Sequence, residues 1–211
     1  AVQASVDAQS APVSCTKGCG ACCRQLVPIS VVEARAIHAL VGEMEEPRRS
    51  AVVARFADAC RRTEAAGLGD DLRDFSRLRS IPEMNAFGMA YFRLGIPCPF
   101  LEDESCSIHL ARPAICREYL VTSDARHCAD PKFDNIERIE LGARVSRALS
   151  ALEGRSDMPA MPWLPLIHAL AWVEAHPHET ESPGPQILQT LFSALARKDL
   201  PLPPGLGGDA A

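Results

Sequence analysis

The sequence predicts a mainly α-helical protein in which helices surround an irregular metal-binding centre, rich in Cys and Pro, with little or no β structure. Apolar residues recur at helical spacing on both sides of that centre. Strands and helices do not alternate along the chain, and no internal repeat is present. Residues 81 to 130 are broken into pieces too short for long helices by a series of prolines, namely Pro82, Pro97, Pro99, Pro113 and the bordering Pro131.

Two helices are predicted before this segment. Ser30 and Glu33 have the spacing of a capping box, which predicts a helix running to about Val41 with a stop at Gly42. A second helix is predicted from just after Pro47 to before Gly67, followed by a shorter helical turn over 70–79. The predicted inner faces are Ala34, Ile37 and Val41 in the first helix, and Val52, Phe56, Ala59 and Cys60 in the second.

The central and C-terminal segments give weaker patterns. The stretch MAYFRLGIPCPFL is the best strand candidate, and its Gly and two Pro limit it to a short or edge strand. Helical periodicity returns from about Phe133 to Leu152, and two further helical segments are predicted over 162–175 and 186–197.

These patterns divide the chain into four parts. Residues 1–14 are small and polar, and residues 201–211 are rich in Pro and Gly, so both are expected to be disordered tails. Residues 15–130 are expected to form a cysteine-cluster metal-binding domain, and 131–200 a helical part packed on it.

Composition excludes two classes of protein. The 22 Lys and Arg against 27 Asp and Glu give a formal charge of -5, and no basic run exceeds two residues, which argues against nucleic-acid binding. No stretch approaches the roughly 18 unbroken apolar residues of a membrane span. No protein partner can be named from the sequence.

The nine cysteines are the unusual feature of this composition. Four of them lie within residues 15 to 23, in CTKGCGACC. Disulfide-rich secreted scaffolds are usually short and carry an even number of cysteines. The sequence therefore favours a reducing compartment, the cytoplasm, with cysteines held for metal or redox chemistry.

The cysteine spacing favours metal. Cys19 and Cys22 form a C-x2-C knuckle, in which Gly20 lets the backbone turn tightly so that two sulfurs can face one ion. Cys23 follows directly, and neighbouring side chains project in different directions, so Cys22 and Cys23 serve either different ions or two edges of one cluster. A segment broken by prolines folds poorly by core burial alone, and thiolate–metal bonds can supply the missing stabilisation. The candidate ligands number eight: Cys15, Cys19, Cys22, Cys23, Cys98, Cys106, Cys116 and Cys128.

Eight thiols suit two four-ligand sites, or one larger cluster with spare thiols. The metal is expected to be zinc or iron, the latter as a 4Fe-4S cluster, because both take four Cys ligands and spacing does not separate them. His109 and His127 adjoin cysteines and are weaker candidates. The ninth cysteine, Cys60, is expected to pack in the core as a small apolar side chain. Four cationic residues lie beside the cysteines in the sequence, and they are either partners of the thiolates or solvated surface charges. They are Lys17, Arg24, Arg112 and Arg117.

The two cysteine blocks resemble a known family. CTKGCGACC is similar to the C-x3-C-x2-C-C signature of the cysteine-cluster family of zinc- or iron-chelating proteins, also called YkgJ-like. The resemblance covers roughly residues 15 to 130, and Cys128 fits a looser continuation of the pattern. His109 departs from it, since an aromatic residue is common there. The second block consists of Cys98-Pro99-Phe100-Leu101, Cys106-Ser107-Ile108-His109, Arg112-Pro113 and Cys116-Arg117-Glu118-Tyr119.

Three functions from different classes remain. The family resemblance implies a metal-binding protein. A more distant resemblance to the flagellin lysine methylases implies an iron–sulfur-dependent methyltransferase-like enzyme using S-adenosylmethionine, although the chain has no Gly-rich strand-to-helix turn for the methyl donor. The third is a thiol redox protein, in which Cys22 and Cys23, or Cys19 and Cys22, cycle between dithiol and disulfide.

Overall fold

The computed structural model describes residues 2–74, 77–78, 80–132, 134–153, 163–177 and 184–196. It confirms a mainly α-helical protein in which the strands are two-residue pieces. The α-helices are α1 (Val2–Asp7), α2 (Val31–Gly42), α3 (Arg48–Ala65), α4 (Gly69–Arg73), α5 (Ile81–Arg93), α6 (Ala114–Glu118), α7 (Val145–Ser150), α8 (Ala169–Ala175) and α9 (Gly184–Ala196). The 3-10 helices are η1 (Ala21–Arg24), η3 (His109–Ala111), η4 (Ala125–Ala129), η5 (Ala151–Glu153) and η6 (Leu166–His168). The strands are β1 (Pro28–Ile29), β2 (Leu101–Glu102), β3 (Ser105–Cys106) and β4 (Leu164–Pro165).

The first two predicted helices, α2 and α3, are confirmed. The Ser30 side chain accepts a hydrogen bond from the Glu33 backbone N–H, and the Glu33 carboxylate accepts one from the Ser30 backbone N–H, so the capping box is formed. The predicted apolar positions of both helices are buried, except that Cys60 is only half-buried. Its thiol donates a hydrogen bond to the Ile167 carbonyl at 3.2 Å, so this side chain packs between α3 and η6.

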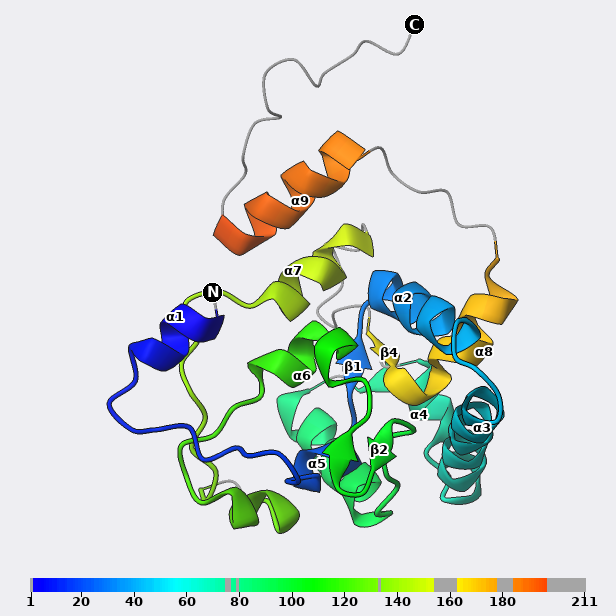
Figure 1. Cartoon of the computed structure of the whole chain (residues 1–211), viewed down its shortest axis with the longest axis horizontal. Coiled ribbons are helices and arrows are strands. Elements are labelled where there is room, and N and C mark those ends of the chain that lie inside the picture. The colour runs from blue at the N-terminus through cyan, green and yellow to red at the C-terminus, as the bar shows by residue number, and fades with distance from the viewer. Residues whose placement is uncertain are drawn as a thin grey trace, which may run out of the picture.

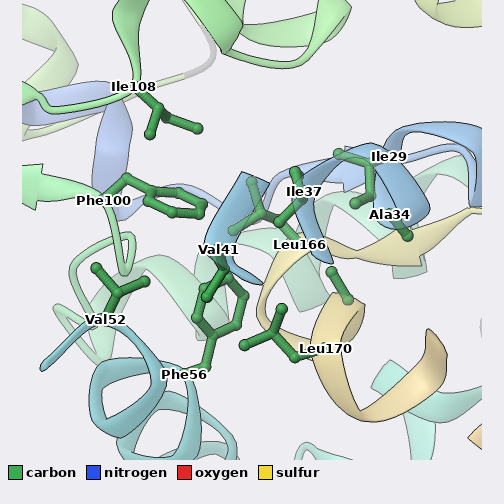
Figure 2. Packing of buried hydrophobic residues seen from close by; sticks show 11 residues of the cluster. Ile29, Ala34, Ile37, Val41, Val52, Phe56, Phe100, Ile108, Leu166 and Leu170 are labelled. Atoms are coloured by element: carbon green, nitrogen blue, oxygen red, sulfur yellow. The ribbon is translucent and has the colours of Figure 1, made fainter. Parts of the chain in front are cut away.

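The main core forms where α2, α3 and α8 meet the loop before β2, and Figure 2 shows its side chains. Phe56 and Phe100 pack edge to face with ring centroids 5.5 Å apart. Leu166 and Leu170 enter this core from the C-terminal part of the chain. The pairing of β1 with β4 ties the same part to the segment that follows η1. Residues 164–175 therefore complete the core against which the cysteine-bearing loops pack.

The strand predicted in MAYFRLGIPCPFL is wrong for its first half, because residues 89–93 belong to α5. A second capping box, Ser80 with Glu83, starts this helix, and Pro82 lies in its first turn, where a missing N–H costs nothing. The helix ends before Gly95, which has a φ of +57°. The last five residues of α5 thus replace the first half of the expected strand, and the nearest strand begins only at Leu101.

The helix predicted from about Phe133 to Leu152 is also largely wrong, because only α7 and η5 are helical among its described residues. Residues 136–139 instead run beside 120–122, where the Ile139 N–H donates to the Leu120 carbonyl at 3.0 Å. The Asn135 side chain accepts from the Lys132 N–H and donates to the Asp130 carbonyl, which makes a local turn. Pairing with a distant segment and this turn outweigh the apolar periodicity.

The remaining helical predictions are confirmed in outline. The turn predicted over 70–79 overlaps α4, which begins one residue earlier, and the segment over 162–175 contains η6 and α8 with β4 ahead of them. The segment predicted over 186–197 overlaps α9, which begins two residues earlier. Figure 1 shows α9 lying over α7, away from α3, α4 and α5. The expected N-terminal tail contains α1, none of whose residues is buried. The expected tail at 201–211 lies outside the described residues. In the part of the chain that the structure describes, no helix combines the length and apolar character needed to cross a membrane.

Candidate metal centre

Four short pieces of chain carry the eight candidate cysteines. The first four, from Cys15 to Cys23, lie in the loop that ends in η1. Cys98 lies just before the β2–β3 hairpin and Cys106 lies on it. Cys116 lies in α6, and Cys128 lies in η4. The 3-10 helix η1 contacts η4, and α6 lies beside β1, which follows η1 in the chain. Each piece is too short to be stable alone, so its position depends on contacts with the others.

The loop over 15–24 is shaped by two glycines. Gly18 adopts a φ of +89°, a conformation that L side chains rarely take. Gly20 lies against the hairpin, where a Cβ atom would come within 2.5 Å of the Glu104 Oε2 and 2.8 Å of the Leu101 Cδ1. The absence of a side chain at residue 20 therefore lets the CGACC turn approach the hairpin closely.

The hairpin is held against this loop by backbone and side-chain bonds. Asp103 and Glu104 have φ values of 48° and 54°, as a two-residue turn with the twist of a hairpin requires. The Cys98 N–H donates to the Cys23 carbonyl at 2.7 Å. The Arg24 guanidinium makes a bidentate contact with the Glu104 carboxylate, at 3.0 and 2.6 Å. These contacts fix Cys23 beside Cys98 and Cys106.

Two carboxylates hold α6, which carries Cys116. Glu33 uses its second oxygen to accept a hydrogen bond from the Ala114 N–H at 2.7 Å. Glu118, which is 5% exposed, accepts from the Ser146 N–H at 3.0 Å and from the Ser146 hydroxyl at 2.5 Å. The short helix is thus tied to α2 at one end and to α7 at the other, which holds the helical turn that carries Cys116 in place.

The first and last candidate cysteines are also brought together. The Ser14 N–H donates to the Val121 carbonyl at 2.9 Å, which places Cys15 beside the strand-like segment leading to η4. Asp124 caps η4 by accepting from the Arg126 N–H at 2.9 Å. Cys128 is 3% exposed on the inner side of this turn.

The thiols influence one another electrostatically, which shows that they lie close together. The Cys23 thiol donates a hydrogen bond to Cys22 and thereby lowers the pKa of Cys22 to about 7, whereas the pKa of Cys23 is raised. Burial, together with smaller contributions from the neighbouring Cys106 and Cys22, raises the pKa of Cys98 to about 12. Burial likewise raises the pKa of two other thiols, with added contributions from neighbouring cysteines; these thiols are Cys116 and Cys128.

Arg112 lies among these thiols. Burial raises the pKa values of Cys15 and Cys116, and the positive charge of Arg112 opposes that rise. The same charge adds to the lowering of the pKa of Cys22 by Cys23. The Arg112 Nε is, within the described residues, the buried side-chain nitrogen or oxygen that lacks a hydrogen-bond partner. A buried guanidinium nitrogen without a partner, on a side chain whose charge interacts with thiols, fits a site that carries net negative charge, as a thiolate-bound metal does. The donor set therefore suits a thiophilic metal.

The other predicted neighbours differ from Arg112. Lys17, Arg117, His109 and His127 are exposed. Arg117 donates to the backbone carbonyls of Arg112 and Leu110, which supports η3. The His127 Nδ1 lies 2.8 Å from the Asn135 carbonyl oxygen, which orients its ring toward that loop. Within the described ranges, no group of three or more Cys, His, Asp or Glu side chains has the geometry to hold a metal ion as the side chains stand.

Several residues of the site were not predicted. Glu33 and Glu118 position α6, and Gln25 donates to the Tyr119 hydroxyl at 3.2 Å beside Cys22 and Cys128. The capping box identified Glu33 as a helix-start residue, but nothing in the local sequence indicated its bond to Ala114, 81 residues away.

Fold and site together define a class, a helical protein whose loops bring thiols near the half-buried side chain of Arg112. A family model described as "CxxCxxCC: Putative zinc- or iron-chelating domain" matches residues 14–138, more than half of the chain. The chain therefore belongs to this zinc- or iron-chelating family, and all eight candidate cysteines lie within the match. Three residues separate Cys15 from Cys19, whereas two separate the first two cysteines of the CxxCxxCC motif. No curated protein and no solved structure matches the chain, and the resemblance to flagellin lysine methylases has no support from these comparisons.

Proposed function

We propose that this protein binds zinc or iron, the latter as an iron–sulfur cluster, through the thiolates of eight cysteines. The observation that carries the proposal concerns Arg112, whose Nε is buried without a hydrogen-bond partner and whose charge interacts with Cys15 and Cys22. The proposed ligands are Cys15, Cys19, Cys22, Cys23, Cys98, Cys106, Cys116 and Cys128.

Charge supports this assignment. Four thiolates on one divalent ion leave a formal charge near -2, which a buried cation stabilises. A guanidinium can donate hydrogen bonds to thiolate sulfur through a nitrogen that finds no partner in the protein. Arg112 would then compensate the charge of the bound metal rather than form an ordinary salt bridge.

Metal would also connect pieces of chain that have little regular structure. The cysteine-bearing loops, η1 and η4 are joined by few backbone bonds, and metal–thiolate bonds contribute directly to folding free energy. The proposed metal domain is 15–130, with the helical part 131–200 packed on it. Reduced thiols suit a reducing compartment such as the cytoplasm.

The geometry opposes a redox role for the adjacent pair. Consecutive Cα atoms across a trans peptide lie about 3.8 Å apart, whereas unstrained disulfides join Cα atoms about 4.4 to 6.8 Å apart. A disulfide between Cys22 and Cys23 would therefore be strained. The hydrogen bond from Cys23 to Cys22 suits neighbouring metal ligands instead.

Elemental analysis and a visible spectrum of protein purified without oxygen test the proposal. Zinc in a colourless sample, or iron with broad absorption that bleaches on reduction, supports thiolate binding. Fully titratable thiols without metal would defeat it. Cys19→Ser should lower the metal content, whereas Cys60→Ser is the matched control and should keep it, because Cys60 bonds to Ile167 away from the other thiols.

A further inference from the structure

We infer that the eight cysteines form two adjacent four-thiol metal sites rather than one cluster. This inference rests on the proposed function. The first site consists of Cys15, Cys19, Cys22 and Cys128. The second site consists of Cys23, Cys98, Cys106 and Cys116.

The 3-10 geometry of η1 separates the two central cysteines. A 3-10 helix has three residues per turn, so consecutive side chains point about 120° apart. Cys22 and Cys23 are consecutive residues of η1. η1 contacts η4, which carries Cys128, while the Cys23 carbonyl accepts the Cys98 N–H at 2.7 Å. Cys23 thus borders the hairpin that carries Cys106, and η1 also borders the turn that carries Cys128.

The members of the first site interact with one another. Cys128 interacts electrostatically with Cys15, Cys22 and Cys19. Cys15 in turn interacts with Cys22 and Cys19. The bond from the Ser14 N–H to the Val121 carbonyl holds the loop over 15–24 beside the segment that leads into η4.

The second site is built on the hairpin and α6. Cys23 interacts with Cys98 and Cys106, and Cys116 interacts with the same two thiols. Cys98 and Cys106 also pack against the main hydrophobic core, so this site lies deeper in the molecule than the first. A four-thiolate site matches the ligand number of structural zinc and of iron–sulfur clusters.

Cys22 and Arg112 lie where the two sites meet. Cys22 also interacts with Cys98 and Cys116, and it accepts the hydrogen bond from Cys23. Arg112 interacts with Cys15 and Cys22 of the first site and with Cys116 of the second. Two adjacent sites, each near -2, repel one another, and a cation between them reduces that repulsion.

Native mass spectrometry and elemental analysis of matched variants test the division. The wild type and the Cys60→Ser control should each hold two zinc ions, or two iron–sulfur clusters, per chain. Cys128→Ser and Cys106→Ser should each retain one, a twofold loss. If wild type holds one metal centre, or if either variant loses all metal while its circular dichroism is unchanged, the division is wrong. Wild type without any metal would instead refute the proposed function.

A cobalt titration of the wild type provides a test that does not depend on folded variants. Two four-thiolate sites should bind two Co²⁺ ions per chain with thiolate charge-transfer absorption, and protect eight thiols from alkylation while Cys60 reacts. Saturation at one Co²⁺, with four thiols still reactive besides Cys60, would overturn the two-site arrangement.

Discussion

Replacing Arg112 by Met removes its positive charge and keeps much of its apolar stem. The guanidinium interacts with Cys15, Cys22 and Cys116, so its loss should weaken metal binding. Two unit charges about 4 Å apart interact by roughly 4 kcal/mol at an effective dielectric constant of 20, which sets an upper bound. Residues that support metal ligands typically contribute 10- to 100-fold in affinity, or about 1.4 to 2.8 kcal/mol. We expect Arg112→Met to fall in that range.

The assay is competition for zinc with a chelator of known affinity, together with thermal unfolding of the metal-free protein. Arg112→Lys, which keeps the charge, should recover much of the affinity. Arg126→Met is the matched control, because Arg126 lies two residues from Cys128 but its side chain is 90% exposed and pairs with Asp124. Metal-free Arg112→Met should not lose stability through Nε, which has no partner to lose. Equal zinc affinity in Arg112→Met, Arg126→Met and wild type would refute the charge argument.

Two further predictions concern the fold. Phe100→Ala removes a ring that is 1% exposed and packs against Phe56, so it should lower the free energy of unfolding by about 3 to 5 kcal/mol in urea titrations of the metal-loaded protein. The exposed Ile81→Ala should change it by less than about 0.5 kcal/mol, and equal losses would contradict this packing. Burial, and secondarily Arg73, lowers the pKa of His168 in the folded state, so the unfolded chain binds more protons and stability falls as the pH drops below about 6.5. His168→Gln should therefore lose less stability than wild type between about pH 7.5 and 5.5, and an equal loss would show that His168 does not carry this dependence.

Local signals predicted part of the fold. The capping box at Ser30 and the apolar spacing of α2 and α3 act within a few residues, so sequence alone predicted these helices. The same signal at Ser80 was missed, because Pro82 was interpreted as a break although it lies in the first turn of α5. The helix predicted from 133 failed because backbone pairing of residues 136–139 with 120–122 is a long-range choice that periodicity does not report.

In the candidate site too, local sequence signals predicted some features and long-range contacts determine the rest. The cysteine spacing selected eight thiols, and the structure brings them close to one another, while their role as ligands stays a prediction. The bonds that position them join distant residues, such as Glu118 with Ser146 and Arg24 with Glu104. No local pattern encodes such pairs. The sequence marks Arg112 only as a neighbour of the cysteines, whereas in the fold its Nε is buried without a hydrogen-bond partner.

X-ray absorption at the edge of the bound metal tests the central claim most directly, because it reports the atoms bonded to the metal. The account predicts about four sulfur neighbours per metal ion at roughly 2.3 Å, in wild type and in Cys60→Ser. A shell dominated by nitrogen or oxygen at about 2.0 to 2.2 Å would contradict the assignment of these cysteines as the ligands.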